Sequence, residues 1–451
     1  MNPTPASIEM TAREPQLSNR WLKVLVVAGV ACVGIERIDV LGGSGPLALT
    51  PALIVSCLLI GTCLVLVIRR RIAFRWRLAT ALLLGFMGVA LAGSALNGMA
   101  VLSLGRSALL AISILGGWAL ITLAVVMRRY DLLRWGAAAG LALFALFALL
   151  QVALWVSVGP PGLGRVGPID LGLMQLGAEL PRITGTTIDP NRACLTVTFF
   201  VTLLLARFPS LRPLPAAQQL IVAGLATALV IATWSRSGLL LYVIVVGGIW
   251  VLPALARLPR RTRWWVVSSV AVVGVSALLV TYLVASDTIE YLVRTRLLVA
   301  QGDSASEHIT LWSIAFAAIA ASPIILLTGI GYGRSYLLLE NVGSMAGAGD
   351  HANFHSIYTT GLIELGIVGL VLLLAILALP IRSRWAPISI GLLTFGIFYQ
   401  AMNDMSQWAL LAVAWTVGET IRTSDQRSSL FLRGRKQAGS ERIPVSDHAD
   451  D

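Results

Sequence analysis

Six side chains that can exchange protons or form hydrogen bonds gather in one short stretch between hydrophobic segments. They are Asp350, His351, Asn353, His355, Tyr358 and Glu364. The surrounding stretch, 329–369, holds two of the four histidines in a chain of 451 residues that is only 12% charged. A histidine with a pKa near neutral suits a general base, because that task needs a pKa close to the working pH. We therefore predict a functional site around His355. The alternative is an extramembrane loop with a polar helix cap.

The spacing of these residues limits which of them can act together. His351 and His355 are four apart, which on one helix could place both on a metal ion. Asn353 and the glycines before it indicate that the helix begins between the two histidines, so we predict no metal site and no cofactor. If the helix begins near His355, Tyr358 lies one turn on and shares its face. Glu364 lies half a revolution round, and either a direct catalytic role or a buried bond to a neighbouring span fits it.

Two arginines near the ends of apolar segments could hold an anion. Arg182 opens the segment RITGTTIDPN, with Thr184, Thr186, Thr187, Asp189 and Asn191 after it, and Arg236 lies in TWSRSGLL. A charged side chain there is costly unless it is matched, and a guanidinium presents a planar fork of donors that suits phosphate oxygens. Arg236 has no acidic neighbour in sequence, so its partner is distant in the chain or a ligand. The alternative is a side chain that snorkels to the interface. Arg334 is the next phosphate candidate.

Long apolar runs must position these side chains. The chain is 57% hydrophobic with a mean hydropathy of +0.82, which is typical of a polytopic membrane protein. We predict an all-α integral membrane protein with about twelve transmembrane helices. They are expected near 21–40, 47–68, 78–96, 107–127, 134–157, 190–207, 216–233, 237–256, 264–285, 355–380, 386–402 and 407–421.

Charge sets the expected topology. Alternate connections carry runs of arginine, which by the positive-inside rule face the cytoplasm together with both termini. The net charge of +12 is explained by these runs, so no nucleic-acid partner is predicted. The four cysteines lie in or beside apolar segments, which indicates neither a disulfide framework nor a zinc site. The first apolar run is interpreted as a membrane helix and not as a removable signal.

The predicted organisation has three parts. Residues 1–20 form a cytoplasmic tail, 21–421 a membrane domain, and 422–451 a disordered cytoplasmic tail. Outer loops are expected near 159–191 and 286–354. Glycines and prolines predict an irregular first loop. In the second, apolar residues recur every three or four positions, which predicts amphipathic helices at the outer leaflet.

The order of these motifs resembles a known family. RITGTTIDPN, then SRSG at a helix start, then GIGYG and His355-x-x-Tyr358-x5-Glu364-x-Gly366 is similar to the O-antigen ligase and polymerase superfamily, over roughly residues 180–370. These are integral membrane glycosyltransferases of the bacterial envelope. The chain departs from the pattern at Ser356, where the family often has asparagine, and at His308, where arginine is frequent.

The resemblance implies transfer of a glycan from a polyprenyl diphosphate to an acceptor hydroxyl, with inversion and without metal. It implies a multi-pass protein of the bacterial cytoplasmic membrane, with the site facing outward and a glycan or glycolipid as acceptor. By motif, Arg182 and Arg236 correspond to a diphosphate clamp and His355 to the base. The type of transferase stays open between a ligase, a polymerase and a protein O-glycosyltransferase. These enzymes differ in their acceptor, and the motifs do not encode the acceptor. A secondary transporter is the main alternative, although few charges lie at mid-span. The other alternative is a membrane scaffold without enzymatic activity.

Overall fold

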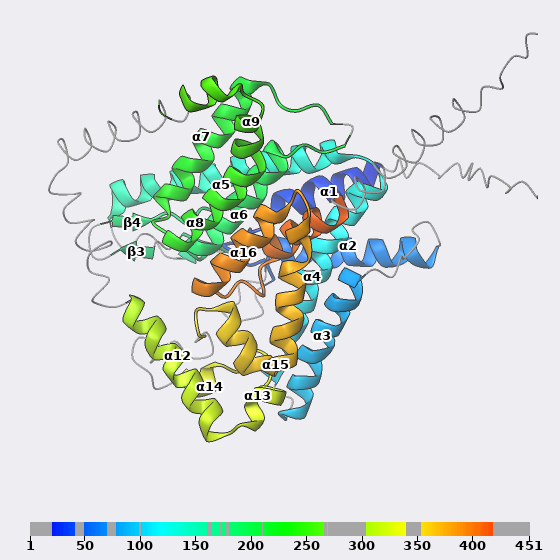
Figure 1. The fold of residues 1–451 in the computed structure, drawn as a ribbon, viewed down its shortest axis with the longest axis vertical. Coiled ribbons are helices and arrows are strands. Elements are labelled where there is room, and N and C mark those ends of the chain that lie inside the picture. The colour runs from blue at the N-terminus through cyan, green and yellow to red at the C-terminus, as the bar shows by residue number, and fades with distance from the viewer. Residues whose placement is uncertain are drawn as a thin grey trace, which may run out of the picture.

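The computed structural model is mostly helical (Figure 1). It describes residues 20–40, 49–69, 78–98, 101–159, 165–166, 168–171, 174–176, 180–209, 211–265, 268, 304–339 and 353–417. The expected tails at 1–20 and 422–451 therefore lie outside the described residues, apart from Arg20, and so does most of the expected span 264–285. The predicted helical membrane architecture is confirmed in general form.

Most expected spans coincide with a helix. In chain order the described helices and helical turns are α1 (Arg20–Cys32), α2 (Pro51–Ile68), α3 (Leu78–Leu96), α4 (Val101–Val126), α5 (Tyr130–Val158), α6 (Pro190–Leu205), α7 (Ala216–Ala232), α8 (Arg236–Val246), a π-helical turn (Gly247–Val251), α9 (Leu252–Ala256), α12 (Ser304–Ala321), α13 (Ile324–Thr328), α14 (Tyr336–Leu339), α15 (Ile357–Ala378), a 3-10 turn (Leu379–Arg382) and α16 (Ala386–Phe398). Of these, α12, α13 and α14 lie within the expected loop 286–354 and not in an expected span. A further apolar helix covers Met405–Val417.

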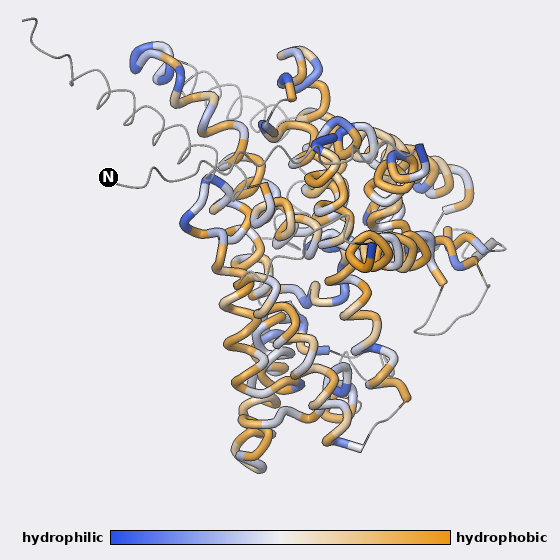
Figure 2. Tube along the Cα trace, turned by 90° about the vertical axis from the view of Figure 1, so that its right-hand side faces the viewer, coloured by the Kyte–Doolittle hydropathy of each residue, from blue (hydrophilic) through white to orange (hydrophobic). Residues whose placement is uncertain are grey.

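Six helices are long and apolar enough to cross a membrane, judged by length and composition. They are Pro51–Ile68, Leu78–Leu96, Val101–Val126, Tyr130–Val158, Arg236–Ala256 and Ile357–Arg382. Five shorter apolar helices accompany them in the described ranges. Apolar residues follow the helices, while hydrophilic residues gather at helix ends and connections (Figure 2). The total of about twelve spans stays a prediction.

The segment 159–191, expected to be an outer loop, contains short strands that the sequence did not predict. Strands β1 (Arg165–Val166) and β2 (Ile169–Asp170) form one antiparallel hairpin. Strands β3 (Met174–Leu176) and β4 (Leu180–Arg182) form a second. We expected irregular structure from the glycines and prolines. A short hairpin pairs backbone groups that an irregular chain would leave to solvent, and glycine or proline can occupy its turns.

Helix α16 lies between α8 and α15 and shows how their ends are arranged. Gly248, after the end of α8, packs against Pro387 at the start of α16, whereas Leu241 in α8 packs against Gly391. The two helices are therefore antiparallel. On the other side, Gly396 lies against Ile357, the first residue of α15. The N-terminal ends of α8 and α15 consequently lie beside the C-terminal end of α16.

Helix α15 is broken at Gly366, which has a φ of +68°. A Cβ built on Gly329 would lie 2.3 Å from the carbonyl oxygen of Glu364, so these backbones approach as only glycine permits. At the break the N–H of Ile330 donates to Ile363 O over 2.8 Å, and the N–H of Gly331 donates to Glu364 O over 3.1 Å. Carbonyls freed inside an apolar helix are thus satisfied by a neighbouring segment, as burial in a membrane protein requires.

Candidate functional site

His355 lies two residues before the first residue of α15, in a left-handed backbone conformation. Its φ is +50°, and its N–H donates to Asn353 Oδ1 over 2.9 Å. Ser356 then precedes the first helical residue, Ile357, so the helix starts where the sequence suggested. The ring of His308, in α12, meets the His355 ring edge to face with centroids 6.0 Å apart. His308 also contacts Phe398 at the end of α16, at 6.3 Å.

Tyr358 and Glu364 bind neighbouring segments. The Tyr358 hydroxyl donates to the carbonyl of Leu393 in α16. The buried Glu364 carboxylate accepts hydrogen bonds from the Gly333 N–H at 2.8 Å, the Ser335 N–H at 3.0 Å and the Ser335 hydroxyl at 2.6 Å. Glu364 therefore holds the loop 330–335 against α15. This is the contact that the buried-carboxylate alternative requires.

Arg236 is the first residue of α8, and the residues around it are tied to α6. Ser235 caps the helix, because its Oγ accepts from the Gly238 N–H over 3.0 Å. The hydroxyls of Ser235 and Ser237 both donate to Asn191 Oδ1, at 2.5 and 3.1 Å. Asn191 is in the first turn of α6. The start of α8 is thus fixed to the start of α6, with the exposed Arg236 side chain between the two serines.

Arg182 reaches the same place from β4. Its Nε donates to the carbonyl of Thr233, three residues before Arg236, over 3.2 Å. Burial lowers the pKa of Arg182, and the positive charge of Arg236 lowers it further, while Asp189 opposes the shift. A group with so high an ordinary pKa remains cationic. The structure therefore brings Arg182, Arg236 and Asn191 together at one end of α8.

The threonines that follow Arg182 are occupied by structural contacts. Arg37 is buried in the α1–α2 connection, and its Nε donates to Thr187 O over 2.7 Å while a second nitrogen bonds Thr184 Oγ1. Gln151 in α5 bonds the Thr184 hydroxyl and backbone N–H, both at 3.0 Å. These contacts fix the segment that carries Arg182 into the membrane domain.

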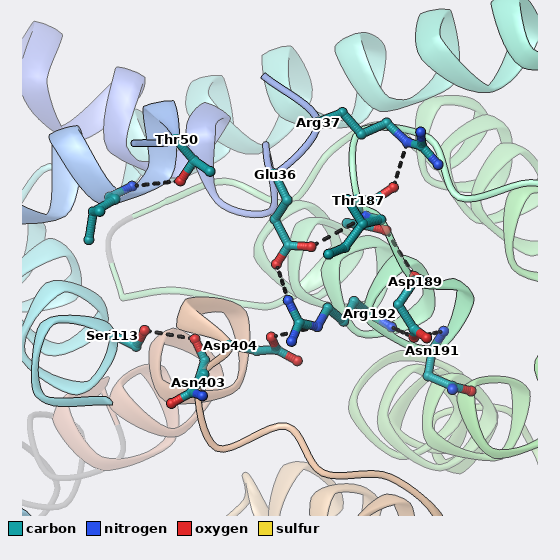
Figure 3. Close-up of polar contacts among 12 residues, drawn as sticks. Glu36, Arg37, Thr50, Ser113, Thr187, Asp189, Asn191, Arg192, Asn403 and Asp404 are labelled. Carbon is teal, nitrogen blue, oxygen red and sulfur yellow. Dashed lines mark hydrogen bonds and ion pairs between the residues drawn. The ribbon is translucent and has the colours of Figure 1, made fainter. Parts of the chain in front are cut away.

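An ionic cluster that the sequence analysis missed lies beside the start of α6 (Figure 3). Arg192 Nη1 is 2.9 Å from Glu36 Oε1, and its Nε is 3.1 Å from Asp404 Oδ1. The same Nε donates to the Tyr399 hydroxyl over 2.9 Å. One guanidinium therefore joins the α1–α2 connection, α6 and the connection after α16. No spacing in the sequence signals it, because the partners are 156 and 212 positions away.

Asp404 is the most constrained member of this ionic cluster. Its side chain is buried, and neither carboxylate oxygen accepts a hydrogen bond from the described residues beyond the 3.1 Å ion-pair contact with Arg192. Burial raises the pKa of Asp404 to about 8 against the attraction of Arg192, with Glu36 and Asp189 adding to the rise. One guanidinium faces several carboxylates, so a proton is retained more readily here than in water.

The remaining predicted residues lie elsewhere or outside the described ranges. Arg334 donates to the carbonyl of Asn97, at the end of α3, and its Nε has no hydrogen-bond partner in the described part of the chain. His351 falls outside the described residues. Within them, no group of three or more histidine, cysteine, aspartate or glutamate side chains could hold a metal ion.

These contacts place two sets of residues around the C-terminal end of α16. Arg182, Arg236 and Asn191 form one set, which we call the arginine set, at the starts of α6 and α8. His355 and His308 form the other, with His308 against Phe398. Because α6, α8 and α15 all begin here, the positive ends of three helix dipoles face the same region. This arrangement can stabilise an anion and accept a proton nearby.

A family model described as O-Antigen ligase matches residues 221–374. The matched segment contains Arg236, Arg334, His355 and Glu364, while Arg182 precedes it. A search of curated proteins finds no match. The resemblance to the O-antigen ligase and polymerase superfamily is confirmed by this match, which supports a membrane role of the glycosyltransferase kind in polysaccharide assembly.

Proposed function

We propose that the protein moves a glycan from a polyprenyl diphosphate to an acceptor hydroxyl at the outer face of the bacterial cytoplasmic membrane. The observation that supports this most is the meeting of three helix starts beside the C-terminal end of α16, with Arg236 at one and His355 at another. One group can hold the departing phosphates and the other can take the acceptor's proton.

The arginine set suits a diphosphate leaving group. Arg182 and Arg236 are close enough for the charge of one to act on the other, so two cations share a region that also receives the N-terminus of α8. Such a pair is stabilised by an anion with two phosphates. Positive charge that is fixed before the reaction stabilises the leaving group as its negative charge grows, without a metal ion in this proposal.

His355 would act as the base in a single displacement. The acceptor oxygen attacks the anomeric carbon while the bond from that carbon to the diphosphate oxygen breaks. The bonding electron pair leaves with the diphosphate, and the hydroxyl proton passes to the His355 imidazole. Attack opposite to the leaving group inverts the anomeric centre.

The apolar surface beside Arg236 suits the lipid part of the donor. Leu239, Leu240 and Val243 in α8 are 40%, 40% and 57% exposed, and they begin one turn after Arg236. A polyprenyl chain can lie along such a face within the membrane while its diphosphate remains at the helix start.

The test compares cells that carry the gene, cells that lack it, and cells that carry the His355→Asn variant at matched protein level. Extracts are assayed for lipid-linked glycan and for finished polysaccharide. Loss of function should accumulate the lipid-linked glycan and deplete the polysaccharide, and EDTA should leave transfer by membranes unchanged. Normal polysaccharide in cells that lack the gene would refute glycan transfer. If those cells instead lose the uptake of a solute, the protein is a transporter. Inhibition by EDTA that a divalent ion reverses would refute the metal-free step.

A further inference from the structure

Three connections converge at the end of α6 remote from the arginine set. They are the α4–α5 turn at 127–129, the α6–α7 connection at 206–215 and the α15–α16 turn at 379–385. Aromatic rings join them: Tyr130 stacks on Phe208 with centroids 5.3 Å apart, and Phe208 meets Trp385 at 6.3 Å. The three connections therefore form one continuous surface.

Two guanidinium groups are fixed on the middle connection from its two sides. Arg134 in α5 donates to the carbonyl of Arg212 and, over 3.3 Å, to that of Ala206. Arg384 donates to the carbonyl of Arg207 over 2.9 Å and lies over the Trp385 ring at 5.1 Å. Because these two guanidinium groups are already fixed, a ligand that binds them loses less free energy to the ordering of side chains.

The charge of this surface is strongly positive. We define the arginine surface as Arg128, Arg129, Arg134, Arg207, Arg212, Arg382 and Arg384. Asp131 is the one acidic residue within these connections and the first turn of α5 as described, and it pairs with Arg129 at 2.6 Å. Among these described residues the surface therefore carries seven arginines and one aspartate.

One donor of this surface lacks an acceptor in the described part of the chain. Arg134 Nε has no hydrogen-bond partner there, although two other nitrogens of the same guanidinium are bound to backbone carbonyls. Buried donors are nearly always satisfied in native proteins. An anionic ligand with several oxygens would supply acceptors here.

We propose that the arginine surface binds the phosphate headgroup of an anionic phospholipid. Trp135, next to Arg134, is 68% exposed, and Leu146 and Leu149 further along α5 are 62% and 68% exposed. An exposed tryptophan at the end of an apolar, outward-facing helix face is typical of the membrane interface. A phosphate held by Arg134 would therefore have acyl chains beside α5, which distinguishes a lipid from free phosphate. This inference does not depend on the proposed glycan transfer.

The test measures binding of phosphatidylglycerol to the purified full-length protein in detergent, with phosphatidylcholine as the uncharged comparison. The double variant Arg134→Gln/Arg384→Gln should weaken phosphatidylglycerol binding about twenty-five-fold, because each arginine near an anionic lipid contributes roughly five-fold. The single variant Arg384→Gln should weaken phosphatidylglycerol binding about five-fold. Because the Arg384 side chain is exposed, this variant tests the site even if the double variant does not fold.

The matched control is Arg257→Gln/Arg260→Gln, which removes two exposed arginines near the end of α9. It should leave phosphatidylglycerol binding within about two-fold of the parent protein, because screening confines these charges to their own surroundings. An equal loss in this control would overturn a specific site and indicate diffuse attraction. Displacement of the lipid by millimolar inorganic phosphate would also overturn the lipid assignment, in favour of a site for soluble phosphate.

Discussion

Trp234 and His355 adopt the same left-handed backbone conformation, each directly before a serine that precedes a helix. Their φ values are +54° and +50°, and Ser235 and Ser356 follow them. This conformation costs a non-glycine residue on the order of 1 kcal/mol, so the surroundings must hold it in place. The helices that begin with Arg236 and Ile357 are therefore entered through the same sharp turn.

This turn allows a variant of His355 that separates its backbone role from its chemistry. Asparagine tolerates positive φ, so His355→Asn should keep the turn while it removes the imidazole. We expect transfer to fall by roughly 10²- to 10⁴-fold, the usual contribution of a general base, with normal amounts of folded protein in the membrane. The measurement is the rate of glycan transfer by membranes with matched protein content.

The control is His351→Asn, at the histidine to which we assign no proton transfer. It should retain most of the activity. Full activity in the His355→Asn variant would remove the base from the proposed reaction, and equal losses in both variants would indicate a shared role for the two histidines.

The sequence predicted local features of the site better than distant contacts. The start of α15 just after His355 and Ser356, and the start of α8 at SRSG, follow from polar residues placed directly before apolar runs. The bonds from Asn191 to Ser235 and Ser237 do not follow, because they join two helices at a register that only packing determines. The contacts of Arg192 with Glu36 and Asp404 had no sequence signal for the same reason.

The break in α15 was missed for another reason. Gly366 lies within a run so apolar that its composition favours one continuous helix. The break depends on Gly329, whose backbone packs against Glu364 from 35 positions away. A sequence pattern alone cannot show that two glycines face each other.

Arg236 can be tested as a diphosphate ligand with two substitutions side by side. Lysine keeps the positive charge but loses the bidentate fork, so Arg236→Lys should remain clearly impaired and Arg236→Ala should be worse. Loss of one such preorganised contact should cost about 2–4 kcal/mol in the barrier, or roughly 10²- to 10³-fold in rate. The measurements are transfer rate and the amount of unused lipid-linked donor.

Arg257→Lys serves as the control for Arg236→Lys, because Arg257 is exposed and lies outside the site. It should show normal transfer. If Arg236→Lys were also normal, Arg236 would be an interfacial anchor, and Arg182 and Arg334 would become the candidates for phosphate binding.

Glu364 should contribute strongly to the stability of the folded protein. Its two oxygens accept three hydrogen bonds from Gly333 and Ser335. In Glu364→Gln one oxygen is replaced by an amide donor, which leaves a buried N–H unsatisfied at a cost of about 1–3 kcal/mol. We expect a lower Tm in detergent, with a smaller decrease for Ser335→Ala. An unchanged Tm with lost transfer would instead support the direct catalytic role.

Asp404 should make the stability of the protein depend on pH. Its pKa is about 8 in the folded protein and 3.8 ordinarily, so the folded state binds the proton more tightly. The stabilisation that Asp404 adds to the folded state by binding this proton is fully present below its ordinary pKa. It is lost as the pH rises through the pKa that Asp404 has in the folded protein. We therefore expect Tm to fall between about pH 5 and pH 9, and Asp404→Asn, which cannot titrate, to flatten that slope. Asp170→Asn, which removes the ion pair with Arg37, is the control and should keep the slope of the parent protein. Parallel curves for the parent and Asp404→Asn would show that Asp404 is already ionised throughout this range, held as a carboxylate by Arg192.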